Sequence, residues 1–414
     1  MEKRTYIIAG GGCSGLSVAL QLAQNTQETS DILIIDREKK TANDRTWCFW
    51  ATVPPCPSSI IYHSWKSLSF ADRRGVVTQS IAPYTYYMVR SANWYAYMWS
   101  ELQKYEQVKF IQSSIHQVGE DEQGAFVRTT EGILRGDYVL NSVQPGKEDK
   151  QKWPTYQLWQ HFAGWWIETD RDVFDPENAR LMDFRPDQHG DSRFMYVLPY
   201  SRRKALVEFT VFSRQLLTME AYEREIAQYM EQYFPDTSYS VIEKERGKIP
   251  MTNKKHRRYQ HARVLNIGTV GGAVKPTTGY AFLRIQSEAQ QLAQNLLRGE
   301  RAADTLTSAV RFTFYDRLLL HILTHHGHRG AGIFSALFRA NPMRRILTFL
   351  NEKSTLWQEI KIFAHLPYGP FLRALGAQLW YRWSSWFSRK WYQNWTPTPA
   401  TSLEQEHQII QQKL

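Results

Sequence analysis

The feature that most constrains the fold lies at the start of the chain, where two apolar segments flank a glycine-rich turn and a helical pattern. Residues 6–9 and 31–36 are short apolar runs typical of buried strands, and apolar residues recur at helical spacing over 16–23. Strands joined by a crossover helix pair in parallel. The pattern therefore predicts an α/β fold built on a Rossmann-like sheet.

The turn after the first strand carries a G-x-G-x-x-G motif. Its first glycine permits the tight turn, its second lets a pyrophosphate approach the backbone, and its third lets the helix pack on the strand. Asp36 ends the second strand, where an acid binds a ribose hydroxyl. A plain glycine-rich turn with a surface aspartate is the alternative. The predicted nucleotide contacts are Gly10, Gly12, Ser14, Gly15, Asp36 and Arg37.

A second glycine-rich loop follows an apolar strand at 264–268 and precedes a helix expected from about 279 to 297. In flavoproteins of this architecture such a loop sets a helix N-terminus against the flavin, although many flavin hydroxylases have an aspartate where this chain has Thr269. An ordinary capped helix start is the alternative. An interrupted nucleotide fold favours FAD over NAD. The predicted contacts are Gly268, Gly271, Gly272, Pro276, Thr277, Thr278 and Gly279.

The middle of the chain has a different pattern. It contains apolar strands at 194–198 and 205–212, a hairpin turn at 201–204 and an acidic helix near 219–233. The predicted organisation is a discontinuous FAD-binding domain at 1–152 and 251–304 with substrate-side insertions, a substrate-binding domain with a mixed β-sheet at 153–250, a C-terminal helical region at 305–396 and a tail at 397–414.

Positive charge is concentrated in the helical, aromatic segment near the C-terminus. Residues 311–395 hold 12 lysines and arginines against three acids, an excess of nine out of a formal charge of +11. Aromatic side chains interspersed with arginines are typical of helices that lie on an anionic membrane surface. Nucleic-acid binding and a helical cap on the other domains are the alternatives.

Other features exclude several classes of protein. Three cysteines without metal spacing argue against a disulfide framework and fit a reducing cytoplasm. No secretory leader and no apolar stretch of roughly 18–20 residues is visible, so neither secretion nor a membrane-spanning helix is expected. The histidines between 321 and 328 lack carboxylate partners at suitable spacing, so no metal site is expected.

Four segments resemble the lycopene cyclase family, and they occur in the family's order. They are Asp44–Trp50, Leu181–Phe184, Phe194–Pro199 followed by Val207–Thr210, and Lys275–Tyr280 in the second glycine-rich loop. With the N-terminal motif they cover most of residues 5–290. The C-terminal third carries little that resembles the family.

The resemblance implies a lycopene β-cyclase, which closes the ψ-ends of lycopene and other carotenoids into β-ionone rings, giving γ-carotene and then β-carotene. This isomerisation is redox-neutral but requires reduced FAD, with NAD(P)H as the expected electron source. A substrate dissolved in the bilayer favours a peripheral site on the cytoplasmic face of the membrane over nucleic acid, and contacts with other carotenoid enzymes. The alternatives are an FAD-dependent monooxygenase or reductase acting on an isoprenoid lipid, and a non-enzymatic binding protein.

Ring closure needs an acid, a base and a dry pocket for a transient cation. Glu208 lies in an apolar strand that should raise its pKa. The resemblance places it on the first of two adjacent glutamates that related cyclases are thought to need, the second being Phe209 here. A buried glutamate paired with a cation is the alternative. Asp183 is the second candidate acid, or a structural hydrogen-bonding residue at a strand end.

Five further residues complete the predicted site. Trp165, Trp166 and Tyr196 are expected in the substrate pocket, where aromatic faces assist a cation. Arg45 and Arg90 resemble positions near the flavin in such folds, and solvated surface arginines are the alternative interpretation for both.

Overall fold

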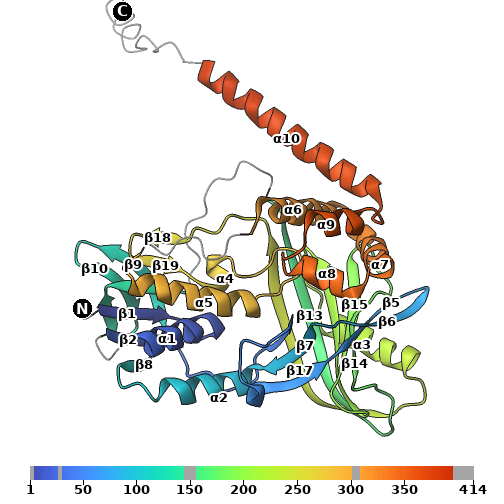
Figure 1. The fold of residues 1–414 in the computed structure, drawn as a ribbon, viewed down its shortest axis with the longest axis horizontal. Coiled ribbons are helices and arrows are strands. Elements are labelled where there is room, and N and C mark those ends of the chain that lie inside the picture. Colours follow the sequence, from blue (N-terminus) through green and yellow to red (C-terminus); the bar gives the residue numbers. More distant parts are fainter. Residues whose placement is uncertain (1–3, 27–29, 144–154, 301–307, 395–414) are drawn as a thin grey trace, which may run out of the picture.

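The computed structural model describes residues 4–26, 30–143, 155–300 and 308–394 (Figure 1). The predicted tail at 397–414 lies outside the described residues. The α/β fold class is confirmed, because a Rossmann-like sheet, a larger mixed sheet and C-terminal helices are all present.

The nucleotide-type sheet has six strands within the described residues, in the order β18-β19-β12-β1-β2-β8. Strands β19 to β8 are parallel, and β18 is antiparallel to β19. Two strands from residues 259–266 therefore return to a sheet otherwise built from the first 141 residues. The bounds are β1 Arg4–Ala9, β2 Ser30–Asp36, β8 Val108–Gln112, β12 Tyr138–Asn141, β18 Tyr259–His261 and β19 Val264–Asn266.

Successive side chains of β1 point to opposite faces of this sheet and pack against the two layers that cover it. Tyr6 and Ile8 pack towards α1 (Cys13–Asn25), α2 (Ser91–Leu102) and α5 (Phe282–Leu297), whereas Ile7 and Ala9 pack on a three-stranded sheet. That sheet is β9 (Ile115–Asp121), β10 (Gly124–Thr129) and β11 (Gly132–Gly136). The alternation is the period of two expected of a strand that is buried on both faces.

The mixed sheet has seven strands in the part of the chain that the structure describes, in the order β17-β13-β16-β15-β14-β5-β6, and only β14 and β5 pair in parallel. Its last two strands come from residues 67–80, well before the segment 153–250 that the sequence suggested for it. The bounds are β5 Ser67–Asp72, β6 Gly75–Ser80, β13 Gln157–Thr169, β14 Asn178–Asp183, β15 Ser192–Pro199, β16 Lys204–Ser213 and β17 Tyr239–Thr252.

A small sheet of β3 (Thr46–Ala51), β7 (Thr85–Arg90) and β4 (Ile61–Trp65) joins the two large ones. Adjacent residues of β3 point to different cores, since Phe49 packs beside α1 and α5 while Trp50 packs with the mixed sheet. A short 3-10 turn at Ser58–Ile60 precedes β4. The small sheet therefore fixes the nucleotide-type sheet against the mixed sheet.

Helices cover both faces of the mixed sheet. Helix α3 (Met219–Tyr233) packs on one face and occupies the predicted helical segment. Helices α6 (Val310–His325), α7 (Gly330–Ala340), α8 (Met343–Leu350) and α9 (Leu356–Phe363) pack on the other, with a 3-10 turn at Gly327–Arg329. Helix α10 (Tyr368–Asn394) then projects beyond the other helices (Figure 1).

An ion pair ties α7 to the edge of the mixed sheet. Arg339 donates to Asp72 on β5 at 2.8 Å and to the carbonyl oxygen of Gly75 at 2.6 Å. Burial alone would raise the pKa of Asp72, but hydrogen bonds from Arg339 and Arg74 hold that pKa well below its ordinary value. Asp72 is 6% exposed, so removing a partner leaves its charge poorly solvated.

We expect Arg339→Ala to lower the free energy of unfolding by about 1–3 kcal/mol at pH 7, as for the loss of a charged hydrogen bond. Because the pKa of Asp72 is lowered on folding, its contribution is present at neutral pH and is lost as the carboxylate is protonated. The difference from the wild type should therefore shrink as the pH falls below about 5. Urea unfolding at several pH values measures it, and a difference that is independent of pH would contradict this account.

Candidate active site

The first glycine-rich turn has the geometry that its motif predicted. Gly10 has a φ of +109°, which favours glycine. A Cβ on Gly15 would lie 1.9 Å from the carbonyl oxygen of Gly10, so helix α1 packs directly on the turn. A Cβ on Gly12, by contrast, would meet nothing within 4 Å. The middle glycine therefore leaves open space at the N-terminus of α1.

The groups around this space fit a dinucleotide. Among the described residues, the buried Ser14 Oγ has no hydrogen-bond partner. No side chain from the described segments caps α1, which leaves its first N–H groups available to a phosphate. Asp36 lies at the end of β2 and accepts a hydrogen bond from the Gly11 N–H at 2.7 Å, which aligns the acid with the turn. Arg37 is exposed and lies beside Glu38.

The second glycine-rich loop contacts the first. A Cβ on Gly268 would lie 2.7 Å from Ser14 Cβ, so the start of the short helix α4 (Gly268–Gly271) touches the N-terminus of α1. Gly272 ends α4 with a φ of +88°. Two segments far apart in sequence are thus brought into one place, as the predicted nucleotide site requires.

The later part of this loop faces the mixed sheet. The helix that follows begins at Phe282, three residues later than expected. The Thr277 hydroxyl donates to Asp316 at 2.7 Å, and that contact anchors the loop to α6. Within the described chain the buried Thr278 Oγ1 is without a hydrogen-bond partner, and a Cβ on Gly279 would lie 2.5 Å from Gln160 Oε1. The loop therefore presents an unpaired hydroxyl and bare backbone to the sheet.

A cavity of about 110 Å³, here called the glutamate cavity, lies where this loop meets the mixed sheet and β3. Glu208 of β16 lines it, as does the predicted pocket residue Tyr196 of β15. The remaining lining residues are Thr46, Trp47, Cys48, Tyr86, Gln160, Phe162, Leu198, Leu206, Glu245, Ile249, Thr278, Gly279 and Tyr280. An acid, aromatic rings and the second glycine-rich loop thus share one cavity.

Glu208 is half-buried and accepts a hydrogen bond from Thr210 Oγ1 at 2.9 Å. Burial, and then the neighbouring charge of Glu245, raise the pKa of Glu208 well above its ordinary value. The partner of Glu208 is therefore a second carboxyl group and not the arginine or lysine of the alternative interpretation. A carboxylic acid that remains protonated at neutral pH can deliver a proton.

Glu245 on β17 was missed in the sequence. It accepts hydrogen bonds from Thr46 Oγ1 at 2.7 Å and from Trp166 Nε1 at 3.1 Å. Burial raises the pKa of Glu245, and these two donors oppose that rise. A signal was available, since residues 243–248 read Glu-Lys-Glu-Arg-Gly-Lys, which places acids on one face of a strand and bases on the other.

The pairing of the strands shows on which face of the mixed sheet each of the other predicted site residues lies. Trp166 lies on the face of Glu208 and donates to Glu245, whereas Trp165 lies on the opposite face in the core beneath α3. Asp183 aligns through Met195 with Phe209, the neighbour of Glu208, and so also faces α3. Trp165 and Asp183 therefore point away from the glutamate cavity.

Asp183 has a complete set of local partners on that face. It is fully buried and accepts hydrogen bonds from Tyr229 Oη at 2.6 Å and from Arg185 Nε at 2.8 Å. Arg180 Nη1 lies 3.4 Å from it. This placement matches the alternative interpretation of a structural hydrogen-bonding residue at a strand end, and we assign Asp183 no part in the proposed chemistry.

The two arginines predicted near the flavin differ in their surroundings. Arg45 is exposed and donates to the carbonyl oxygen of Asp44 at 2.5 Å, which fits the surface alternative. Arg90 is half-buried, forms an ion pair with Glu243 and lies 4.5 Å from the ring centre of Trp166. Arg90 therefore does not line the glutamate cavity itself, but it contacts Trp166, which donates a hydrogen bond to Glu245.

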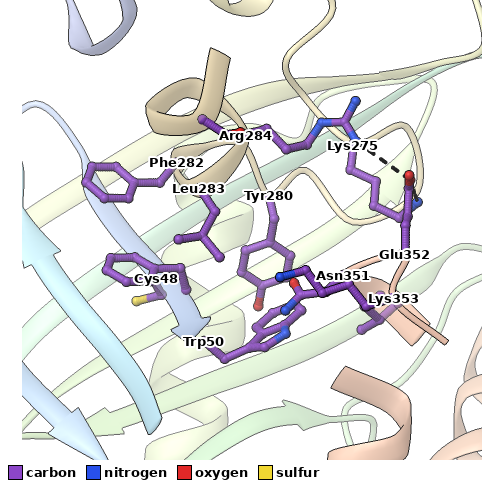
Figure 2. A pocket seen from close by; sticks show the side chains of 13 residues that line it. Cys48, Trp50, Lys275, Tyr280, Phe282, Leu283, Arg284, Asn351, Glu352 and Lys353 are labelled. Carbon is purple, nitrogen blue, oxygen red and sulfur yellow. Dashed lines mark hydrogen bonds and ion pairs between the residues drawn. The ribbon is translucent and has the colours of Figure 1, made fainter. Parts of the chain in front are cut away.

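A neighbouring cavity of about 280 Å³ lies between β3, the start of α5 and the end of α8. Figure 2 shows Tyr280 and Trp50 side by side within it, and the Lys275–Glu352 ion pair at its edge. Tyr280 and Cys48 line both cavities, and the Tyr280 and Tyr86 hydroxyl oxygens are 3.4 Å apart. Tyr280 therefore stands at the boundary between the two spaces.

Comparison with known proteins agrees with this arrangement. The family model described as lycopene cyclase protein matches residues 6–376, which is most of the chain. The chain belongs to the lycopene cyclase family. The resemblance of its four segments is thereby confirmed, and the match extends well into the C-terminal helices, whose sequence carries little that resembles the family.

The curated relatives of this cyclase-family chain are plant enzymes. It is 29% identical over 210 residues to a chloroplastic neoxanthin synthase of Solanum tuberosum, covering 46% of this chain and 41% of the relative. It is 29% identical over 209 residues to the chloroplastic lycopene beta cyclase of Arabidopsis thaliana, covering 46% and 40%. The matched region is thus less than half of each relative.

Solved structures show the same fold at low identity. A 2-methyl-3-hydroxypyridine-5-carboxylic acid oxygenase aligns with a TM-score of 0.57 and 13% identity over 84% of this chain and 96% of that one. A flavin-dependent monooxygenase in complex with FAD and substrate gives 0.56 and 14% over 91% and 72%. A geranylgeranyl bacteriochlorophyll reductase-like protein from Thermoplasma acidophilum gives 0.54 and 12% over 91% and 97%. The chain therefore has the same overall fold as these three proteins, one of which was solved with FAD bound.

Proposed function

We propose that this chain is a lycopene β-cyclase that converts the ψ-ends of lycopene into β-ionone rings, giving γ-carotene and then β-carotene. The observation that carries the proposal is a cavity in which Glu208 lies beside a second carboxyl group, Glu245, and the second glycine-rich loop; burial and the charge of Glu245 raise the pKa of Glu208. Such a reaction needs a proton and no oxidant. The family and its plant relatives support the same substrate class.

The side chains of the glutamate cavity fit the steps of ring closure. Glu208 donates a proton to the terminal alkene carbon, the neighbouring double bond closes the ring on the resulting cation, and a ring proton then leaves to a carboxylate. The rings of Tyr86, Tyr196 and Tyr280 border the cavity, where they exclude water and offer electron-rich faces to the cation. No atom of the substrate is gained or lost.

The two glycine-rich loops are the proposed FAD site. Gly12, Ser14 and the N-terminus of α1 would hold the pyrophosphate, and Asp36 would bind the ribose. The backbone of residues 276–279 would contact the flavin. Reduced FAD, when bound, supplies negative charge that stabilises a nearby cation. We propose NAD(P)H as the source of its electrons, as the resemblance to the lycopene cyclase family implied.

A monooxygenase or reductase acting on an isoprenoid lipid is the competing function, since solved proteins of this fold include both classes. Purified protein, lycopene in liposomes and pre-reduced FAD under anaerobic conditions distinguish the three. A cyclase yields ring-bearing carotenoid of unchanged mass with no further reductant. Product that appears only with oxygen, or reductant consumed in proportion to product, would reject the cyclase. The same chromatogram counts the rings.

We propose that α9 and the start of α10 lie on an anionic membrane surface, on its cytoplasmic face. Their outward side chains include Trp357, Ile360 and Leu372, which are 65%, 57% and 63% exposed. Lys361 lies 5.3 Å above the ring of Trp357, and Arg373 is exposed beside Leu372. In the described part of the chain, no helix combines the length and apolar character needed to span a bilayer.

We expect the double variant Trp357→Gln and Ile360→Gln to weaken binding to anionic vesicles at least tenfold. Each exposed side chain that enters the interface contributes about 1.5–3 kcal/mol, and both lie outside the protein core, so folding should not change. Sedimentation with phosphatidylserine vesicles measures the loss. Val53→Gln, at a residue that is 77% exposed, is the control. Equal pelleting of the double variant would remove α9 from the membrane proposal.

A further inference from the structure

Three neighbouring strands place two glutamates on either side of a glycine. Gly164 of β13 aligns with Glu208 of β16 on one side and with Glu245 of β17 on the other. Strands two apart are separated by about 10 Å, and a side chain on the middle strand would normally lie between them. Gly164 has none, so the side chains of Glu208 and Glu245 both lie next to it and line the same cavity, close enough to influence each other's pKa.

The space above Gly164 is too small for a side chain on this residue. A Cβ there would lie 3.2 Å from Glu245 Cγ and 3.3 Å from Glu208 Cβ, which is closer than ordinary contact. Both carboxyl groups also line the glutamate cavity. Two acids that touch each other and face a cavity are a costly arrangement unless they share a proton, because two like charges at this distance repel strongly.

The two acids differ in the number of hydrogen-bond donors around them. Glu245 accepts from Thr46 and Trp166, so its charged form has two donors. Glu208 accepts only from Thr210 among the hydrogen bonds of its described neighbours and meets the Glu245 carboxylate on its other side. This difference in donors favours the proton on Glu208 and the charge on Glu245.

The other titratable groups around the pair do not replace Glu245 as the nearest charge. Cys48, Tyr86, Tyr196 and Tyr280 face the pair from β3, β7, β15 and the loop, and burial raises the pKa of each, so all four are neutral near pH 7. The charge of Glu243, the next inward-facing acid on β17, is met by an ion pair with Arg90.

We propose that Glu208 and Glu245 form a carboxyl pair that holds one proton above Gly164 and serves both proton transfers of ring closure. This rests on the proposed cyclase function. The Glu208 O–H bond breaks as a C–H bond forms at the terminal alkene carbon. A ring C–H bond then breaks and its proton returns to the pair. One proton leaves and one returns, so no oxidant, reductant or outside base is consumed.

The test is the proton affinity of Glu208 with and without its partner. We expect Glu245→Gln to move the midpoint at which Glu208 ionises down by roughly one pH unit or more, because the repelling charge is gone. Infrared titration reads this directly as the carbonyl band of a protonated acid that is present in the wild type and absent in Glu208→Gln. The alkaline limb of the pH–rate profile should fall by the same amount.

Matched variants show whether the charge of residue 245 is responsible. Glu245→Asp keeps the charge and should restore part of the shift, which a purely structural role would not do. Glu168→Gln on β13 is the control, because Glu168 pairs with Lys204 near the surface. An unchanged midpoint in Glu245→Gln, or no protonated acid at pH 7 in the wild type, would overturn the pair.

The infrared measurement does not depend on turnover. If the wild type forms no rings, the proposed function fails, yet the titration still decides whether the pair exists. If rings form and the midpoint does not move, the pair fails while the cyclase stands. Should Glu245→Gln not fold, the aspartate variant and the wild-type titration still decide the outcome.

Discussion

Glu208→Gln is expected to lower the rate of ring formation by about 10²- to 10⁴-fold, the usual contribution of a general acid. The amide keeps the shape of the side chain but carries no acidic proton. Glu208 lies in the glutamate cavity, where Thr210 is its one hydrogen-bond donor among the described residues, and it forms no ion pair there, so we expect the fold not to depend on its charge. Pigment analysis in lycopene-producing cells measures ring formation, and flavin absorbance of the purified protein should be unchanged.

Two matched variants make the result specific. Glu168→Gln, on the adjacent strand and partly exposed, should form rings at the wild-type rate. Asp183→Asn should lower stability, because the buried carboxylate pairs with two half-buried arginines, and should leave the pH–rate profile in place. A normal yield of β-carotene from Glu208→Gln would remove Glu208 from the chemistry, whatever the controls show.

The nucleotide half of the fold was predictable from the sequence because its signals are local. The turn at 10–15 must bring helix and strand together, and that geometry requires glycine. Apolar runs such as 31–36 mark strands buried on both faces. The helix at 219–233 was predictable because acids and apolar residues alternate there with helical period.

The extent of the mixed sheet was not predictable from such signals. Strands β5 and β6 join it from residues 67–80, and pairing across about 100 residues of chain leaves no local trace. Strand β17 is an edge strand with charged residues on both faces, so it lacks the apolar alternation that marks a strand. Glu245 was missed for that reason.

Site residues on strands depend on which face meets the cavity. Trp165 and Trp166 are adjacent, and a period of two sends one to the α3 core and the other towards Glu245. Glu208 and Asp183 differ in the same way. The sequence identifies the acids, but the face is set by packing against α3 and α6–α9, which the strand's own residues do not encode.

The C-terminal segment combines two of the predicted interpretations. The inward-facing residues of α6–α9, such as Phe334 and Ile362, cover the mixed sheet. Arg339 and Arg311 form ion pairs with the buried acids Asp72 and Glu359. The exposed rings of α9 and α10 lie on the other side. Counting charge over the whole segment therefore overstates the cationic surface that a membrane would meet.

Two glycine variants in the first turn should separate folding from cofactor binding. In Gly15→Ala the new Cβ would lie 1.9 Å from a backbone oxygen, so α1 must move off β1. We expect a loss of about 1–3 kcal/mol of stability or more, as for overpacked cores, together with a loss of flavin. Thermal unfolding of the flavin-free protein measures the first effect.

Gly12→Val should behave in the opposite way. Its backbone has a φ of −84°, which valine adopts, and a Cβ there meets nothing within 4 Å, so stability should change by no more than about 1 kcal/mol. The side chain instead enters the space assigned to the pyrophosphate. Losing even one charged hydrogen bond there, worth about 1.5–3 kcal/mol, weakens flavin affinity by roughly 10- to 150-fold. Flavin titration followed by fluorescence measures the affinity. If the valine variant bound flavin as tightly as the wild type, the phosphate would have to lie elsewhere, and the N-terminus of α1 would lose its assigned role.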